Sequence, residues 1–322
     1  MSESGIPDIS VIICSHNPRP EYLQRTLAAL QAQSLPKHQW ELLLVDNASQ
    51  PPLAQRQDLS WHPQGRHVFE AALGLTPARM RGIAEARGNW LVFVDDDNVL
   101  AGDYLANVIA LAASHPRLAV LGAGTLQPEF EISPPAELKP LLSMLALRDA
   151  EAPRRSNNPQ ESAALPCGAG LSVRREIAAQ CAALVEKLKT CVVLDRKGGE
   201  LFSHGDDLFS WAAARAGFEF GIFPELRITH LIGAGRLNQA YFLRLIYYHA
   251  FSHGILHYLL AGDRPRRAGW GRRLRLIPHA LRRGVFSARC QRGWLQGEDR
   301  AANLIAENNL QPLFQPAPNA QK

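Results

Sequence analysis

The sequence predicts an α/β fold in which a single, mostly parallel, twisted sheet is flanked by helices. Over the first 125 residues, short apolar segments alternate with segments of helical periodicity. Strands and helices that alternate in this way are typical of a parallel sheet covered on both faces. Hydrophobic residues make up 46% of the 322 residues, which suits a buried core. From about residue 238 onward the pattern becomes helical and basic, which predicts a C-terminal helical extension.

The chain begins with two clear strands separated by a helix. Residues 9–15 and 40–46 are apolar runs, and such runs predict strands that are buried on both faces. Between them, residues 21–33 place leucines three and four positions apart, which predicts a helix that ends before Pro36. A weaker third strand is expected at residues 66–70.

A second helix is predicted at residues 76–86. Thr76 is suited to the N-cap and Pro77 to the first helical position. Three further elements complete the first 125 residues: a strand at 89–95, a helix at 102–114 and a strand at 118–125.

The region that follows is less regular. Residues 126–165 are rich in Pro, Glu and Asn, which predicts a loop with one short helix near 138–147. Residues 166–176 read as a glycine turn, a short strand and the start of a helix. Residues 204–218 predict a helix headed by carboxylates, and residues 218–232 a pair of short strands.

Polar residues follow three of the predicted strands. The segments are CSHN after the first strand, DNAS after the second and DDDN after the fourth. In open parallel sheets, ligands bind outside the carboxyl ends of the strands. We therefore expect these three segments to converge on one crevice.

Five segments in this order resemble the family 2 glycosyltransferases. They are SVIICSHNPRPEYLQRTLAALQAQS, ELLLVDNAS, GLTPARMRGIAEARGNWLVFVDDDN, CGAGLSVRRE and HGDDLFSWAAARAGF. The resemblance covers about residues 8–232 and implies a GT-A fold with an inverting mechanism. It divides a domain at 1–235 into a nucleotide-sugar-binding half at 1–125 and an acceptor half at 126–235. Residues 236–322 would form a basic, amphipathic helical region.

The three consecutive aspartates predict a metal site. The resemblance implies that Asp97 binds Mn²⁺ or Mg²⁺, that Asp95 binds the same ion or the ribose, and that His230 completes the set. In an extended strand Asp95 and Asp97 point the same way, so Asp96, counted among the donor-binding residues, would point outward. The alternatives are a solvated acidic turn, and for His230 a packed, hydrogen-bonded histidine.

Five further residues are predicted to bind the donor. By resemblance, Ser15 and Asn17 line the base pocket, and Asp46 contacts the base or ribose. Asp46 is also suited to cap the turn that follows it, and both roles can hold together. Arg79 would reach the nucleotide through its guanidinium fork, although the next position carries a methionine in place of the usual asparagine. Gly168 permits close approach of the backbone to the sugar, or simply a tight turn.

Two carboxylates at a helix start are the candidate catalytic groups. An inverting transfer needs a base that removes a proton from the acceptor hydroxyl. The resemblance implies that Asp207 is this base and that Asp206 supports it or binds the acceptor. A helix N-terminus stabilises both anions, which is also a sufficient structural reason for acidic residues there.

The predicted function is an inverting, metal-dependent glycosyltransferase. The donor would be a nucleotide sugar, with UDP- or dTDP-sugars favoured, and the acceptor a lipid-linked or cell-surface glycan of the bacterial polysaccharide type. The alternative is a catalytically inactive protein of the same fold that binds nucleotide sugars or acts as a scaffold. A nucleotidyltransferase is less favoured, because no glycine- and lysine-rich phosphate loop follows the first strand.

The positive charge of the chain is concentrated near its C-terminus. The net charge is +5, yet residues 264–292 contain ten arginines and no Asp, Glu or Lys. Basic segments that also carry apolar residues are typical of binding to anionic membrane surfaces, here through residues 241–292. The alternatives are a solvated face or a subunit's acidic surface; nucleic acid is disfavoured, because no reading module accompanies the segment. His249, His253 and His257 share one helix face, as a polar stripe or a metal site.

The cysteines and the N-terminus predict the compartment. Five scattered cysteines without a CxxC pair are typical of reduced thiols. No signal peptide and no run long enough to span a membrane is apparent. We expect a cytoplasmic protein, with or without peripheral attachment to the inner face of the plasma membrane. The oligomeric state stays open.

Overall fold

The computed structural model describes residues 6–188, 201, 204–267, 269–274, 276, 278 and 283–313. Cys191 and residues 268, 275, 277 and 279–282 of the basic segment therefore lie outside the described residues.

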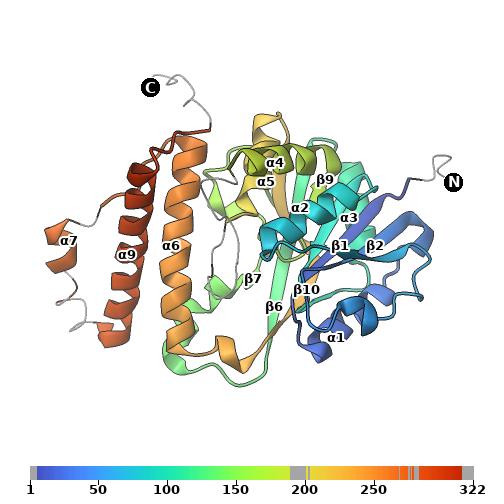
Figure 1. The fold of residues 1–322 in the computed structure, drawn as a ribbon, viewed down its shortest axis with the longest axis horizontal. Helices are drawn as coiled ribbons and strands as arrows, with labels where there is room; N and C mark the ends of the chain where they lie inside the picture. The colour runs from blue at the N-terminus through green and yellow to red at the C-terminus, as the bar shows by residue number, and fades with distance from the viewer. Residues whose placement is uncertain are drawn as a thin grey trace. The chain divides into compact units, whose positions relative to one another are not determined.

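Ten strands form one sheet with helices packed on it, as the sequence predicts (Figure 1). The strands are β1 (Ile9–Ser15), β2 (Trp40–Asp46), β3 (Gly65–Phe69), β4 (Trp90–Val94), β5 (Asn98–Leu100), β6 (Leu118–Phe130), β7 (Arg148–Asp149), β8 (Arg154–Ser156), β9 (Ser172–Arg174) and β10 (Glu219–Ile232). The helices are α1 (Pro20–Gln31), α2 (Leu75–Glu85), α3 (Tyr104–Ser114), α4 (Arg175–Leu188), α5 (Asp207–Arg215), α6 (Gln239–Ala261), α7 (Trp270–Leu274) and α9 (Val285–Glu307). Short 3₁₀ helices are η1 (Lys37–Gln39), η2 (Leu53–Gln55), η3 (Ala136–Leu145), η4 (Ser162–Ala164) and η5 (Ala234–Arg236).

The strand order explains where the polar strand ends lie. The main path of the sheet runs β3-β2-β1-β4-β9-β6-β10-β5. Neighbours among β3, β2, β1 and β4 are parallel, β9 runs antiparallel between β4 and β6, and β10 is parallel to β6. In this arrangement β1, β2 and β4 end at the same edge of the sheet. The expected convergence of their polar residues follows directly.

The first two strands have the predicted bounds because their sequences leave no ambiguity. Every residue of β2 is buried, and in β1 only Cys14 is partly exposed. Buried apolar runs of this kind are stabilised by the hydrophobic effect on both faces of the sheet. Trp40, at the start of β2, is fully buried and donates through Nε1 to the carbonyl of Leu35 at 3.2 Å.

Three predicted boundaries are wrong. The pair of strands expected at 218–232 is the single strand β10, which stays paired with β6 across a register shift between Phe223 and Arg227. Such an irregularity accommodates Pro224, which has no N–H to donate. The strand β6 continues to Phe130, so the expected loop begins later. Helix α2 begins at Leu75 with Gly74 at the N-cap position, where φ is 133°, so Thr76 lies inside the first turn.

The chain folds into two compact units. Unit 1 comprises residues 1–131, 142–187 and 205–232 and contains the whole sheet, whereas unit 2 comprises residues 132–141, 188–204 and 233–322. The predicted division between residues 235 and 236 lies close to the last of these boundaries, but unit 2 begins at residue 233 and also takes the two internal segments.

Unit 2 is built around the long helices α6 and α9, which lie side by side (Figure 1). Small residues bring the two backbones close together. A methyl group built on Gly297 would lie 2.4 Å from the carbonyl oxygen of Tyr247 and 2.9 Å from Cβ of Ala250. One built on Gly254 would lie 2.9 Å from Cβ of Ala301. Among the described residues, no helix is long and apolar enough to cross a membrane.

Candidate functional site

The carboxyl ends of β1 and β2 are held together by the main chain and meet the turn after β4. Ser15 pairs with Asp46 in the parallel register, and the next amide, that of Asn47, donates to the carbonyl of Ser15 at 2.8 Å. The hydroxyl of Ser15 donates to Oδ2 of Asp96. The structure therefore brings residues from all three predicted polar segments to one edge of the sheet.

Asp46 holds the loop that follows β2. Its Oδ1 accepts from the amide of Ser49, and its Oδ2 accepts from the amide of Leu53, each at 2.8 Å. The residue is 4% exposed. Both carboxylate oxygens thus serve main-chain donors, which is the turn-capping role that the sequence left open.

Asn47 is a site residue that sequence reasoning missed. Its side-chain amide donates to the carbonyls of Glu70 and Ala72 at 3.1 and 2.7 Å, and its Oδ1 accepts from the amide of Gly74 at 2.8 Å. Asn47 thereby fixes the segment that leads into α2. The asparagine after a strand-ending aspartate is the only sequence signal for this role.

Asn17 belongs to the same loop system. It adopts a left-handed conformation with φ of 46°, its amide donates to Oγ of Ser49 at 2.9 Å, and its Oδ1 accepts from the amide of Gln50 at 2.8 Å. His16 contacts the carbonyl of Asn47 through Nδ1 at 2.6 Å. Asn17 is predicted to line the base pocket. In the structure its side chain accepts a hydrogen bond from the loop after β2.

The outward orientation expected for Asp96 is wrong. The strand β4 ends at Val94, and residues 95–98 form a turn in which the amide of Asn98 donates to the carbonyl of Asp95 at 3.0 Å. The alternation of side chains holds only in extended backbone, so it does not order these three carboxylates. Asp96 instead accepts from Ser15.

Asp97 faces His230, which lies on β10. Oδ2 of Asp97 and Nε2 of His230 are 3.4 Å apart, and His230 is 5% exposed. The main chains are joined as well, because the amide of Leu231 donates to the carbonyl of Asp97 at 2.8 Å. The side-chain amide of Asn98 donates to Oδ1 of Asp97 at 3.0 Å and so orients the carboxylate.

The ring of His230 has a defined orientation. Its Nδ1 lies 3.1 Å from the carbonyl oxygen of Leu145, and because a carbonyl can only accept, Nδ1 carries the proton of this bond. The other ring nitrogen, Nε2, lies on the side of the Asp97 carboxylate. Imidazole nitrogens and carboxylate oxygens are both common ligands of divalent cations.

These residues fit a divalent cation that the substrate would help to bind. Within the described residues, no group of three or more His, Cys, Asp or Glu side chains is placed to hold a metal. Mg²⁺ is commonly held by one or two carboxylates together with phosphate oxygens of the substrate. Asp97 and His230 would supply the protein ligands. The side-chain oxygen of Asn98, buried beside them, has no hydrogen-bond partner within the described part of the chain.

A second group of predicted site residues lies close together in unit 1. It consists of Arg79, Gly168 and Asp206. Arg79 on α2 is 5% exposed, and its guanidinium carbon lies 5.8 Å from the centre of the Phe93 ring. A methyl group built on Gly168 would lie 2.7 Å from Nη2 of Arg79 and 3.5 Å from Oδ2 of Asp206. The absence of a side chain at residue 168 therefore lets the loop lie directly against the guanidinium.

The next glycine in this loop, Gly170, shapes the loop. Gly170 has a φ of 69°, and its carbonyl accepts from the hydroxyl of Tyr104 at 2.7 Å. A methyl group there would lie 2.4 Å from Cδ1 of Ile228. A side chain at residue 170 would therefore be strained by the positive φ and would displace the end of the Ile228 side chain.

Cys167 marks where two of the carboxylates lie. Burial raises the pKa of its thiol, and the negative charges of Asp206 and Asp95 act in the same direction. The thiol therefore stays protonated, which argues against a nucleophilic role. Asp95 and Asp206 thus lie near the same loop, and nothing in the sequence signalled Cys167 as their neighbour.

Asp207 is the first residue of α5, and Asp206 is at the N-cap position. Neither is fully exposed. Asp206 forms no side-chain cap to the helix, so its carboxylate is directed elsewhere, and its Oδ2 lies on the side of Gly168. Of the two predicted catalytic residues, Asp206 is the one that lies near Arg79.

Comparison with known proteins gives a family match over most of the sheet. Residues 10–177, just over half of the chain, match the family model described as Glycosyl transferase family 2. Polypeptide N-acetylgalactosaminyltransferase 3 of Drosophila melanogaster is 38% identical over 98 residues, which are 29% of this chain and 14% of that protein. Glycosyltransferase AglE of Haloferax volcanii is 33% identical over 97 residues, which are 29% of this chain and 32% of that protein.

The chain spans only a small part of these curated relatives, 14% and 32% of their lengths. Among solved structures, the mannosyltransferase PcManGT from Pyrobaculum calidifontis, in complex with GDP-Man and Mn²⁺, aligns with a TM-score of 0.52 at 17% identity. The alignment covers 94% of this chain and 76% of that one. This likeness confirms the predicted GT-A type of fold.

Proposed function

The chain belongs to glycosyltransferase family 2, and we propose that it transfers a sugar from a nucleotide-sugar donor to a hydroxyl acceptor with inversion at the anomeric carbon. The observation that carries the proposal is the pair formed by Asp97 and His230 at the carboxyl edge of the sheet, where a partly buried carboxylate lies 3.4 Å from a buried histidine nitrogen. The mannosyltransferase of similar fold, whose structure is in complex with GDP-Man and Mn²⁺, supports a nucleotide-sugar donor and a divalent ion.

In this proposal Asp97 and His230 hold Mn²⁺ or Mg²⁺, with Asp95 as a further ligand or a ribose contact. When bound, the ion would neutralise the diphosphate and so stabilise it as a leaving group. Asn98 orients the carboxylate of Asp97, and Leu145 fixes the ring of His230 so that Nε2 is the ligand atom. Such supporting contacts commonly decide how tightly a metal binds.

Arg79 is placed to bind the donor. Its guanidinium is buried against Phe93 and lies beside the Gly168 backbone. A buried guanidinium forms strong, paired hydrogen bonds with phosphate oxygens. Ser15 and Asp96 would contact the nucleoside at the adjoining end of β1, whereas Asp46 and Asn17 would act there mainly through the loop that they hold.

The carboxylates at the start of α5 are proposed to handle the acceptor. The acceptor oxygen attacks the anomeric carbon, the bond from that carbon to the diphosphate oxygen breaks, and the hydroxyl proton passes to a carboxylate. Family resemblance assigns this base to Asp207, with Asp206 as its support. The proximity of Asp206 to Arg79 and Gly168 supports a place for this pair beside the donor sugar.

The acceptor is proposed to be a lipid-linked or cell-surface glycan. The ten arginines of residues 264–292 support contact with an anionic membrane surface. Trp270 supports it too, because this residue is 85% exposed and tryptophan is favoured at membrane interfaces.

The metal site is tested by ligand-dependent thermal stability. We would screen UDP, dTDP and GDP, with the corresponding sugar nucleotides, with and without Mn²⁺. A ligand at a hundred times its Kd adds about 2.7 kcal/mol of apparent stability. The wild type should show a shift that needs Mn²⁺, and His230→Gln should lose the Mn²⁺-dependent part. The control His38→Gln changes an exposed histidine and should keep the Mn²⁺-dependent part of the shift. Equal metal dependence in His230→Gln would refute the site.

The base is identified by comparing Asp206→Asn with Asp207→Asn. Loss of a general base typically lowers the rate by about 10²–10⁴-fold. The variant that removes the base should lose transfer to the acceptor by that factor while donor binding stays intact. The other variant should change mainly the acceptor KM. Full transfer activity in both variants would contradict the proposal.

A further inference from the structure

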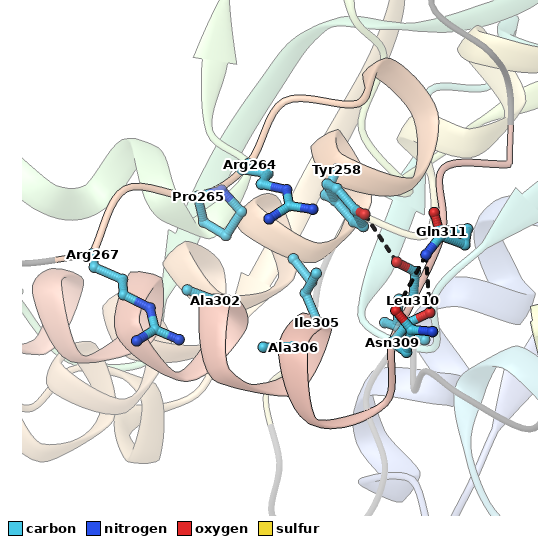
Figure 2. A pocket seen from close by; sticks show the side chains of 10 residues that line it. All are labelled: Tyr258, Arg264, Pro265, Arg267, Ala302, Ile305, Ala306, Asn309, Leu310 and Gln311. Atoms are coloured by element: carbon cyan, nitrogen blue, oxygen red, sulfur yellow. Dashed lines mark hydrogen bonds between the residues drawn. The ribbon is translucent and has the colours of Figure 1, made fainter.

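A cavity of ≈ 380 Å³ lies within unit 2, outside every residue assigned above to glycosyl transfer (Figure 2). It is bounded by the last turns of α6 and α9, by the segment that leaves α6 and by the segment that leaves α9. Its lining combines two kinds of residue. One side is cationic or polar, and the other is made by short apolar side chains.

The cationic side consists of Arg264 and Arg267, whose guanidinium groups face the α9 side of the cavity in Figure 2. Arg264 lies over the ring of Tyr258, with 5.8 Å between its guanidinium carbon and the ring centre. Within the described part of the chain, neither arginine forms an ion pair. Asp263 precedes Arg264 in sequence and does not line the cavity.

The segment after α9 contributes polar residues to the cavity and is joined to α6 by a hydrogen bond. The hydroxyl of Tyr258 donates to the carbonyl of Leu310 at 2.9 Å, which ties the segment after α9 to α6. Gln311 donates to Asn309 at 3.3 and 3.4 Å. The side chains of Ile305 and Leu310 are buried and give the cavity an apolar wall.

From this arrangement we propose that the cavity binds a phosphate group attached to an apolar chain. Two guanidinium groups without a carboxylate partner match the charge and the oxygen geometry of a phosphate. The amides of Asn309 and Gln311 offer further donors. Ile305 and Leu310 would contact the carbon atoms next to the phosphate, which an inorganic ion lacks.

A phosphorylated lipid is the source that the surroundings favour. Trp270, three residues after Arg267, is 85% exposed, and Val285 at the start of α9 is 71% exposed. Exposed apolar side chains among arginines are typical of a membrane interface. The site is independent of glycosyl transfer, although it would give the proposed membrane contact a defined lipid.

A purely structural role for the arginines makes a different prediction. Helices α6 and α9 both end beside the cavity, at Ala261 and Glu307. Helix C-termini carry partial negative charge that arginines stabilise. If this were their whole role, removing the arginines would lower the thermal stability and leave phosphate binding unchanged.

The test is flotation of the full chain with vesicles of phosphatidylcholine containing phosphatidic acid. The variant R264Q/R267Q removes the two cavity arginines. The control R266Q/R283Q removes the same charge from two arginines that are likewise exposed but do not line the cavity. We expect the cavity variant to bind about tenfold more weakly than the control, because charge-assisted hydrogen bonds are lost as well as charge. Equal losses would indicate diffuse attraction and overturn the proposal.

A second pair of variants keeps all the arginines. Ala306 lines the cavity, so Ala306→Glu would place a carboxylate next to the guanidinium groups. Asn303→Glu adds the same charge at an exposed position on α9 outside the cavity. Vesicle binding should fall about tenfold further in Ala306→Glu than in Asn303→Glu. Equal binding by the two variants would again overturn the proposal.

Soluble probes separate the two sources of phosphate. Inorganic phosphate and glycerol phosphate are titrated while the melting temperature is followed, and donor hydrolysis is measured in every variant. A phosphorylated lipid is supported if R264Q/R267Q lowers vesicle binding and the soluble probes do not raise the melting temperature. Stabilisation by inorganic phosphate that R264Q/R267Q abolishes, without vesicle binding, keeps the phosphate site and overturns the lipid. Unchanged hydrolysis in R264Q/R267Q separates this site from catalysis.

Discussion

The ends of β2 and β4 look alike in sequence and differ in the folded protein. Each strand is an apolar run that leads into acidic and amide side chains, DN at the end of β2 and DDDN after β4. Asp46 uses both carboxylate oxygens to accept from main-chain amides of its own loop. Asp97 is oriented by a neighbouring side chain and faces the ring of His230 from a distant strand.

The difference shows how a structural carboxylate can be told from one available to a ligand. A carboxylate whose oxygens accept main-chain donors is already stabilised as an anion, and it holds a loop. Asp97 instead faces a histidine nitrogen from another strand, and both groups are common ligands of divalent cations. We therefore expect changes at the end of β2 to affect folding, and changes after β4 to affect catalysis.

The largest effect is expected for Asp97→Asn. A bound divalent ion contributes several kcal/mol of transition-state stabilisation, so donor turnover should fall by about 10³-fold. The measurement is the initial rate of donor hydrolysis or transfer with Mn²⁺, together with the melting temperature. The control Asp103→Asn changes a half-exposed acid that pairs with Arg227 and should keep its activity. Full, metal-dependent activity in Asp97→Asn would refute the contrast between a structural Asp46 and a metal-binding Asp97.

The next effect is expected in stability, for Asp46→Ala. Two charge-assisted hydrogen bonds to main-chain amides are lost from a buried position. We expect the free energy of unfolding to fall by about 3 kcal/mol, measured by denaturant titration. The comparison is Asp58→Ala, an exposed turn carboxylate that bonds to Ser60, where the change should be much smaller. Unchanged stability with lost donor binding would instead make Asp46 a ligand residue.

A smaller effect is expected for Asn98→Ala. Removing the amide that orients Asp97 should raise the Mn²⁺ concentration for half-maximal activity by about tenfold. The matched control is Asn107→Ala, because the amide of Asn107 donates to the carbonyl of Glu225, away from the site. If both variants show the same metal dependence as the wild type, Asn98 has only a packing role.

The smallest effect is expected for Ser15→Ala. Its hydroxyl contacts Asp96, so its loss should weaken nucleotide binding about fivefold, corresponding to roughly 1 kcal/mol. Isothermal titration with a nucleoside diphosphate measures this directly. Ser49→Ala provides the contrast, because Ser49 accepts from the amide of Asn17 at the end of β2. Ser49→Ala should lower the stability more than the nucleotide affinity. If Ser49→Ala instead lowers mainly the affinity, the comparison between the two strand ends fails.

Much of the sheet could be predicted because its signals are local. β1 and β2 have the predicted bounds, and the strand after α2 differs only at its ends. The single strand β10 could not be predicted from its sequence, because Pro224 usually interrupts a strand. Pairing with β6 on both sides of the irregularity carries the strand through this point.

The site divides in the same way. The family motifs predicted Asp97 and His230 as members of one site, and the fold places them 3.4 Å apart. The motifs could not show that Asp96 turns toward Ser15, because the turn that begins after Val94 ends the alternation of side chains. Nor could they find Asn47, since its partners lie more than twenty residues ahead in the chain.

The sequence by itself determined the alternation of strands and helices over the first 125 residues, the family and the small set of polar residues at the strand ends. These depend on hydrophobic periodicity and on short motifs, which are properties of neighbouring residues. Only the tertiary structure decided what each polar residue does. Asp46 meets amides of its own loop, whereas Asp97 meets a histidine on β10, and the donors and charges around a carboxylate come from segments that only folding brings together.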